Sequence, residues 1–319
     1  YLAKLLLSNN YKVFGIVRVS SKSFTNLEYL KINSEIEFIK CDLLNISAVE
    51  KIIKDIKPDE IYNLAAQSSV FQSYLQPITT FEFNTISVFN LIESIKKINP
   101  KIIYCSASGW GSDGPYLTRP GQDLLVQSVS GAIMTSGKKS DGPVALGTAL
   151  CDQVNAFNCV YAILAALYFR EKTGIGQEIQ TNLLSSAIAF QMQDYFTIQN
   201  LGVQFERPES GIGHPGNPAP FGTYKTKDGY LAIAMNPFDT LVEALGDPSL
   251  LVYNDKQVLF DKRDEIYYRI QAVTITKTTE DWLTIMLGYD LWVAQVNNQS
   301  AVADDPQVIH NNTFINIQH

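Results

Sequence analysis

With 319 residues, the chain is long enough for two domains and a sizeable hydrophobic core. Its 46% hydrophobic and 18% charged residues are typical of a soluble globular protein. The net charge of −7 disfavours a nucleic-acid partner, whose phosphates require a basic surface. We find no run of about 18 apolar residues, so the sequence predicts no membrane span and no membrane partner.

The four cysteines, Cys41, Cys105, Cys151 and Cys159, lack the spacing of metal ligands. Their apolar neighbours favour buried free thiols in a reducing compartment over disulfides. We therefore expect a cytoplasmic protein without a metal site. The sequence starts at Tyr1 inside a helical pattern, without an initiator methionine or a signal peptide, which predicts a fragment whose true start is missing.

The first hundred residues alternate between helical and strand-like patterns. In chain order the pattern predicts a helix over 1–8, strands over 12–19 and 36–41, a helix over 47–56, a strand over 60–66, a helix over 79–98 and a strand over 101–105. Strands that alternate with helices of this length predict a parallel, doubly wound α/β sheet.

Several segments of this region share their residues with a known family, namely 1–7, 15–18, 41–43, 61–68 and 81–98. Through them, residues 1–100 resemble the extended short-chain dehydrogenase/reductases, most closely GDP-mannose 4,6-dehydratase. The resemblance implies a Rossmann-like NADP-binding segment. Arg18 would face the extra phosphate of NADP, Asp42 would contact the adenine, and the turn from Leu64 to Ala66 would line the cofactor.

Simpler roles for two of these residues remain open. Arg18 could be a solvated charge at a strand end, and Asp42 could cap the next turn. The family's glycine-rich phosphate loop and first strand are absent, and so are its catalytic residues at their expected places. The one Tyr-x-x-x-Lys match, Tyr168 to Lys172, lies at the end of a different helix. Because that loop presents backbone N–H groups to the pyrophosphate, we expect any NADP binding to be vestigial.

From Asn99 onward the sequence matches a second family in long blocks, which are 99–116, 119–127, 147–152, 162–177, 213–215, 219–224, 228–234 and 305–308. Residues 99–319 resemble the class III CoA-transferases, which include formyl-CoA and carnitine CoA-transferases. The resemblance implies a Rossmann-like large domain, a smaller domain and a homodimer of interlocked subunits.

Together, the two resemblances predict an α/β chimera. We expect an incomplete Rossmann-like parallel sheet over 1–100, a class III CoA-transferase-like α/β domain over 101–206, and a smaller α+β domain over 207–319.

The most distinctive block surrounds Asp152. Apolar residues at helical spacing predict a helix over 153–172, which Gly174 would end. Asp152 would then lie at or beside the N-cap, where backbone hydrogen bonds and the helix dipole favour its ionised form. An aspartate at this position needs no catalytic role, but the resemblance places the family's nucleophile on Asp152.

The implied reaction is covalent catalysis by a carboxylate. Asp152 would attack an acyl-CoA, form an aspartyl-CoA thioester, and pass CoA to a small carboxylic acid. Coenzyme A would be a substrate, and no cofactor would be required.

Further site residues follow from the same resemblance. The related acyl-CoA racemases carry a histidine where this chain has Gln122, which cannot shuttle a proton, so transferase is favoured over racemase. Asp123 matches an acidic position of the transferases and could instead cap a helix. Gly211, Gly213 and His214 belong to a loop that would line the CoA or acyl group, or else to an ordinary surface loop.

Two readings of other classes remain open. The chain could be a fragment of an NADP-dependent GDP-mannose 4,6-dehydratase. It could also be an inactive or artefactual fusion of the two families.

Overall fold

The computed structural model describes residues 1–18, 25–67, 70–99 and 101–314, and the chain divides into two compact units. The first unit combines Tyr1–Ser106 with Cys159–Gln180, and the second combines Ala107–Asn158 with the chain from Thr181 onward. The division into 1–100, 101–206 and 207–319 stays a prediction.

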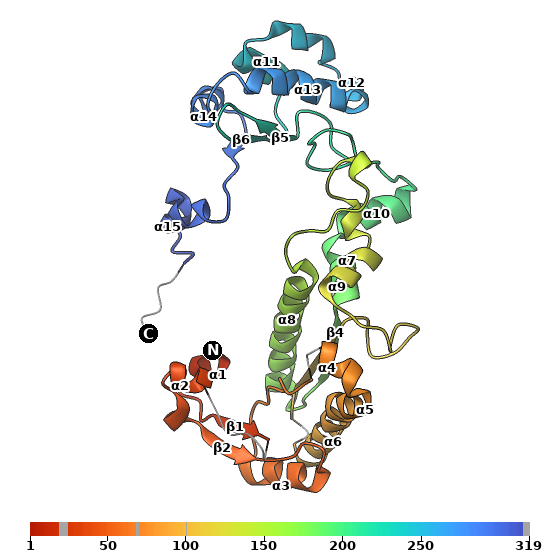
Figure 1. Ribbon diagram of the computed structural model, residues 1–319, viewed down its shortest axis with the longest axis vertical. Helices are drawn as coiled ribbons and strands as arrows, with labels where there is room; N and C mark the ends of the chain where they lie inside the picture. The colour runs from red at the N-terminus through yellow and green to blue at the C-terminus, as the bar shows by residue number, and fades with distance from the viewer. Residues whose placement is uncertain (19–24, 68–69, 100, 315–319) are drawn as a thin grey trace. The chain divides into compact units, whose positions relative to one another are not determined.

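The first unit begins as the sequence predicts. Its elements are α1 (Leu2–Ser8), β1 (Phe14–Val17), α2 (Thr25–Tyr29), the 3₁₀ turn η1 (Asn33–Glu35), β2 (Glu37–Lys40) and α3 (Ile46–Ile56) (Figure 1). Strands β1 and β2 pair in parallel, with Phe14 opposite Glu37. The parallel arrangement follows from the helical crossover between the strands.

The predicted helix over 79–98 is present as a broken run. It comprises α5 (Pro77–Phe81), the π-helical turn η2 (Glu82–Ile86) and α6 (Ser87–Ile98), preceded by α4 (Val70–Leu75). Helix α6 packs against α3, and their buried side chains form one cluster with Cys41. The members of this cluster are Cys41, Val49, Ile53, Leu91 and Ile95.

The predicted strand over 60–66 is wrong. These residues form irregular backbone, and β1 pairs with β2 alone within the described chain. A strand requires a neighbouring backbone to complete its ladder. Local hydrogen bonds replace the ladder here: Ala65 N–H donates to the Asn63 side chain at 3.2 Å, and Tyr62 Oη donates to Glu60 at 2.8 Å.

The central part of the chain is mostly helical. Its elements are β3 (Tyr104–Ser108), α7 (Asp123–Val129), η3 (Ala132–Met134), η4 (Lys139–Asp141), α8 (Leu150–Thr173), β4 (Glu178–Asn182), α9 (Leu183–Phe190) and α10 (Met192–Leu201). Strand β3 pairs with β4 and begins three residues later than the strand predicted over 101–105. Gly174 ends α8 with φ +73°, as predicted.

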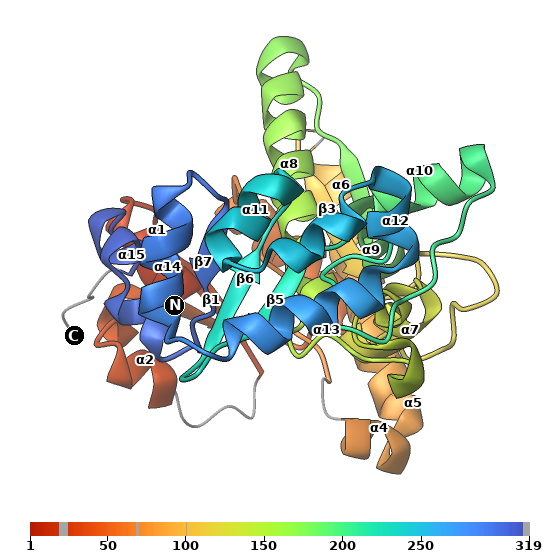
Figure 2. The ribbon, with the colours of Figure 1, turned by 90° about the horizontal axis from the view of Figure 1, so that it is seen from above.

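The C-terminal part contains the largest core. Strands β5 (Gly222–Lys225), β6 (Tyr230–Ile233) and β7 (Val293–Gln295) form an antiparallel sheet. The helical elements are α11 (Phe238–Leu245), η5 (Pro248–Tyr253), α12 (Lys256–Asp261), α13 (Arg263–Thr274), α14 (Thr279–Gly288), η6 (Ala301–Asp304) and α15 (Pro306–His310). Helices α13 and α14 contact the sheet (Figure 2), and Trp282, Tyr224, Leu231 and Ile266 are fully buried between them. The expected α/β class is confirmed.

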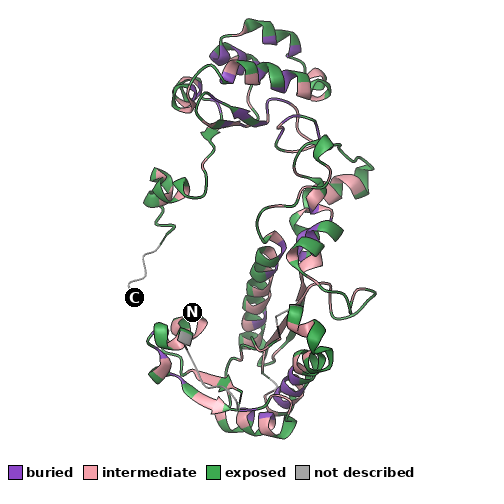
Figure 3. Cartoon of the chain, in the orientation of Figure 1, coloured by how far each residue is buried: buried purple, intermediate pink, exposed green. Residues whose placement is uncertain are grey.

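Helix α8 is long and its surface is mostly exposed (Figure 3). Its exposed apolar side chains include Phe157, Tyr161, Leu164 and Tyr168. By length and composition alone, α8 could cross a membrane, which corrects the expectation that no segment would qualify. A single helix of this kind is weak evidence for a span, since helices of soluble proteins pass the same test.

We predict that limited trypsin digestion cleaves within residues 1–100 before it cleaves the C-terminal core. A two-stranded sheet exposes both of its edges and is marginal by itself, whereas the core around Trp282 buries 18 hydrophobic residues. Mass spectrometry of a digestion time course should show a surviving fragment that contains Asp152 and Trp282. Equal protection of both units would contradict this expectation.

Candidate functional site

The first turn of α8 orients Asp152. Helix α8 starts at Leu150, two residues before Asp152, so Asp152 is inside the first turn and not at the N-cap. Cys151 is fully buried in a cluster with Val126 and Ala187, with Trp110 packed against it. Because successive residues of a helix point about 100° apart, burying Cys151 leaves Asp152 exposed.

Asp123 caps this turn from a different helix. Its Oδ2 accepts hydrogen bonds from the Cys151 N–H at 2.7 Å and from the Asp152 N–H at 3.2 Å. The first N–H groups of a helix have no partner within the helix, and a side-chain oxygen that accepts from them stabilises it. The sequence predicted Asp152 at or beside the N-cap and left open that Asp123 caps a helix, and in the structure Asp123 caps this turn.

Gln127 joins α7 to the loop before α8 and was missed by the sequence analysis as a site residue. This side chain is buried and donates to Asp123 Oδ1 and to the Thr148 carbonyl at 3.3 Å. Its Oε1 accepts from the Leu146 N–H at 2.9 Å. Gln127 lies four residues after Asp123 on the same helix, and this spacing predicts that the two side chains interact.

The pKa of Asp152 is raised above its usual value. Partial burial is the larger cause, and the negative charge of Asp123 is the second. Both effects disfavour the ionised form. Burial and the charge of Asp123 act against the ionisation that the helix terminus was expected to favour.

Gln122 is exposed and precedes α7 as its N-cap residue. A close approach of two glycines positions this segment: a Cβ on Gly109 would lie 2.5 Å from the Cα of Gly121. Trp110 secures it by donating from Nε1 to the Pro120 carbonyl at 3.0 Å. Gln122 and Asp123 therefore lie side by side in sequence at the start of α7, and Asp123 directly contacts the turn that carries Asp152.

A polar network anchors the buried face of α8. Ser186 of α9 donates to Asn155 Oδ1 at 3.0 Å and accepts from Asn158 Nδ2 at 2.9 Å. Asn155 and Ser186 are buried. This network fixes the rotation of α8, and with it the direction of Asp152 one turn earlier.

The loop that carries Gly211, Gly213 and His214 is held within its own surroundings. His214 Nε2 lies 2.9 Å from Asp194 Oδ1, and its Nδ1 accepts from the Gly216 N–H at 3.0 Å. Gly213 N–H donates to the Phe221 carbonyl at 3.1 Å, and Gly211 O accepts from Thr223 N–H at 3.2 Å. These contacts give His214 a positioning role in the loop, and the predicted contact of the loop with CoA stays a prediction.

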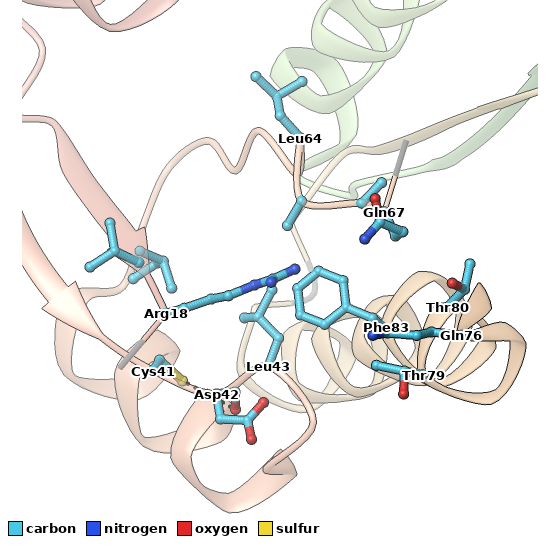
Figure 4. Close-up of a pocket in the computed structure, with 14 residues that line it drawn as sticks. Arg18, Cys41, Asp42, Leu43, Leu64, Gln67, Gln76, Thr79, Thr80 and Phe83 are labelled. Atoms are coloured by element: carbon cyan, nitrogen blue, oxygen red, sulfur yellow. Dashed lines mark hydrogen bonds between the residues drawn. The ribbon is translucent and has the colours of Figure 1, made fainter. Parts of the chain in front are cut away.

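The four residues expected at a cofactor site gather around one cavity of about 620 Å³ in the first unit. Arg18 follows β1, Asp42 follows β2, and Leu64 and Ala66 come from the irregular segment after α3. Figure 4 shows Arg18 reaching across the cavity toward Phe83. The guanidinium carbon lies 4.2 Å from the centre of the Phe83 ring, a contact that the sequence analysis missed.

Two asparagines hold the rim of this cavity. Asn90 of α6 is buried and donates to the carbonyls of Leu43 and Leu44, each at 3.0 Å. Asn84 of η2 accepts from the Gln67 N–H at 2.7 Å and donates back to the Gln67 carbonyl at 3.2 Å. The cavity walls are thus fixed by side chains on the helical run and not by a sheet ladder.

The described residues contain no group of three or more His, Cys, Asp or Glu side chains that could hold a metal ion. All four cysteines are free thiols, with Cys41 and Cys151 buried.

Comparison with known proteins identifies the larger part of the chain. The sequence model of CoA-transferase family III matches residues 89–319. The chain belongs to this family. The model of GDP-mannose 4,6 dehydratase matches residues 1–112, so the two matches overlap around the predicted junction.

Two of the curated relatives are named as succinyl-CoA:glutarate CoA-transferases. The chain is 30% identical to the human succinyl-CoA:glutarate CoA-transferase over 298 residues, which covers 91% of this chain and 64% of the human protein. It is 32% identical to the mouse protein of the same name over 233 residues, covering 71% of this chain and 53% of the relative. The chain therefore spans between about half and two thirds of these relatives.

Solved structures agree with the family. A CAIB/BAIF family protein from Brucella suis matches with a TM-score of 0.66 and 25% identity, covering 87% of this chain and 71% of that protein. A hypothetical protein from Mycobacterium tuberculosis shares the fold, with a TM-score of 0.69 at 18% identity over 97% of this chain and 84% of its own.

We predict that Asp123→Asn lowers the pKa of Asp152 and that Asp123→Ala also destabilises the second unit by about 1 kcal/mol, the usual loss of a helix cap. Asparagine removes the repelling charge but retains an acceptor oxygen, whereas alanine removes both. Carbon NMR of the Asp152 carboxyl and thermal unfolding would measure the two effects.

Asp255, which caps α12 by accepting from Gln257 and Val258, is the matched control. Asp255→Ala should cost similar stability without moving the pKa of Asp152. An unchanged pKa in Asp123→Asn would refute the electrostatic coupling.

Proposed function

We propose that the chain is a CoA-transferase that moves CoA from an acyl-CoA donor to a carboxylic acid acceptor through a covalent intermediate on Asp152. One observation carries the proposal. Within the family-matched region, Asp152 is an exposed carboxylate on a helix turn whose backbone Asp123 already caps. Its oxygens are therefore available to a substrate.

The reaction balances with Asp152 as the only nucleophile of the protein. Asp152 attacks the donor thioester carbonyl, CoA thiolate leaves, and an acyl-aspartyl anhydride forms. The thiolate then attacks the aspartyl carbonyl and expels the donor acid, which leaves an aspartyl-CoA thioester. The acceptor carboxylate repeats these two steps in reverse and restores the Asp152 carboxylate.

The raised pKa of Asp152 bears on this first step. The carboxylate must be ionised to attack, so the rate should increase with pH through its pKa. A more basic carboxylate is also a better nucleophile once ionised. Asp123 therefore contributes a more basic nucleophile through its charge and a fixed backbone through its hydrogen bonds.

The substrates are proposed from the relatives. Human, mouse and Agrobacterium fabrum relatives are named as transferases between succinate and glutarate or their CoA esters. We propose that this chain likewise uses the CoA ester of a small acid and a dicarboxylic acceptor, in the cytoplasm. Coenzyme A is then a substrate and no further cofactor takes part.

Racemisation is less favoured. A human α-methylacyl-CoA racemase is also a relative, 29% identical over 209 residues. That reaction requires a group that can take and return a proton at the α-carbon, and the amide of Gln122 cannot do so.

We further propose a homodimer. The exposed apolar side chains along α8 support this state, because contiguous apolar surface marks interfaces. Sedimentation equilibrium would measure it, and a monomer at micromolar concentration would contradict the proposal.

We predict that Asp152→Ala loses at least about 10³-fold in transfer rate, as removal of a catalytic nucleophile does in other enzymes. Incubation of the unaltered chain with succinyl-CoA followed by hydroxylamine should modify Asp152, as peptide mass spectrometry would show. Asp255→Ala, which removes an aspartate from another helix N-terminus, should keep full activity. Unchanged turnover of Asp152→Ala would overturn the assignment.

A second candidate function is that of an NADP-dependent dehydratase fragment, favoured by the match to residues 1–112 and by the cavity at Arg18. The described residues that line the cavity include no glycine, and therefore no glycine-rich loop that could present backbone N–H groups to the pyrophosphate of the cofactor.

We therefore expect calorimetry with NADP to show no low-micromolar binding. Tight binding would favour the dehydratase function. The absence of both NADP binding and transfer would favour an inactive fusion.

A further inference from the structure

The cavity of the first unit has the setting of a ligand site. It lies where β1 and β2 end, since Arg18 directly follows β1 and residues 41–43 directly follow β2. In parallel α/β sheets, ligands bind outside the carboxyl ends of the strands. Its volume of about 620 Å³ falls in the range of small-molecule sites.

Arg18 is arranged to bind an anion. Its guanidinium stacks on Phe83, and no carboxylate pairs with it within the described residues. Stacking occupies the flat face of the guanidinium and leaves the N–H groups at its edge, which can bind a phosphate with two parallel hydrogen bonds. The side chain is otherwise exposed, so it does not serve the core.

The remaining walls suit a nucleoside. Apolar side chains of Ile16, Leu43 and Leu64 line the space together with the Phe83 ring. Such walls can enclose a flat base. Asp42 uses one oxygen, Oδ1, to accept from the Leu44 N–H at 3.0 Å. Its second oxygen can accept from a ribose hydroxyl or an exocyclic amine.

Hydroxyl and amide groups complete the lining opposite Asp42. These are the side chains of Thr79, Thr80 and Gln76 on the helical run (Figure 4). The lining therefore combines one cation, one carboxylate, neutral polar groups and apolar surface. A base, a ribose and one phosphate match that combination, whereas a dicarboxylate would leave the apolar walls uncovered.

We infer that this cavity binds the 3′-phosphoadenosine end of coenzyme A, with Arg18 on the phosphate. The inference rests on the proposed function, because CoA esters are the substrates of the family and each carries an adenosine with a 3′-phosphate. Asp42 is acidic, so the phosphate lies on the Arg18 side and the base or ribose on the Asp42 side.

The test is calorimetric titration of the full chain with adenosine 3′,5′-bisphosphate. We expect saturable binding that weakens by about 10- to 100-fold in Arg18→Gln, the loss expected for a hydrogen bond to a charged group. AMP, which lacks the 3′-phosphate, should bind the unaltered chain and Arg18→Gln with similar, weaker affinity. Arg18→Lys keeps the positive charge but loses the two parallel N–H donors of the guanidinium. Its affinity for the bisphosphate should lie between those of the unaltered chain and Arg18→Gln.

Lys12→Gln is the matched control. Lys12 lies in the same unit, over the Phe14 ring at 4.6 Å and 3.2 Å from Glu37, and does not line the cavity. The substitution Lys12→Gln also removes one positive charge, but it should leave the affinity for the bisphosphate unchanged. Equal weakening by Lys12→Gln would show a nonspecific charge effect and overturn the inference.

Two further outcomes would also overturn it: no binding of the bisphosphate, or tighter binding of the 2′,5′ isomer, which would indicate an NADP-type ligand. The same titration on Asp152→Ala separates this inference from the proposed function. Binding that persists there while transfer is absent from the unaltered chain would refute the transferase function alone. Transfer without Arg18-dependent binding would refute the cavity assignment alone.

Discussion

The candidate active site depends on how the first turn of α8 is closed. A helix start leaves backbone N–H groups without partners, and here the Asp123 carboxylate, 29 residues upstream of Asp152, accepts from two of them. Burial of Cys151 fixes the rotation of the same turn. Together, these two constraints direct the Asp152 side chain toward solvent. Its carboxylate oxygens are not needed to cap the helix, because Asp123 accepts from the backbone N–H groups.

The same arrangement sets the chemistry of Asp152. An uncharged cap would satisfy the N–H groups equally well, but the carboxylate of Asp123 also raises the pKa of Asp152, in addition to the effect of burial. One side chain, Asp123, thus stabilises the helix start and adds to the basicity that burial gives Asp152. Gln127 connects Asp123 to the loop before α8 through hydrogen bonds to Asp123 and to the Leu146 N–H. A movement of α7 would therefore be transmitted to the turn that carries Asp152.

Local patterns predicted the elements, and distant pairings were not predictable. The helical period placed α3 and α8 to within three residues, and Gly174 marked the end of α8, because these signals lie within a few residues of the element. The strand over 60–66 failed because its formation needs a partner that periodicity cannot supply. Asp152 was predicted as a site residue from its sequence block, and that assignment stays a prediction. The hydrogen bond from the Asp152 N–H to Asp123 joins residues 29 positions apart, which no local pattern could predict.

The cavity of the first unit shows why a site can persist where a strand does not form. In a complete sheet, ladder bonds would hold the Leu64–Ala66 segment against β1. Here Asn84 clamps Gln67 through two hydrogen bonds, and Asn90 clamps the Leu43–Leu44 loop on the other side. Both asparagines lie on the helical run that α3 packs against. The helices therefore hold the segments that line the cavity, which carry Arg18, Asp42, Leu64 and Ala66. Side-chain hydrogen bonds position these segments in place of backbone pairing between strands.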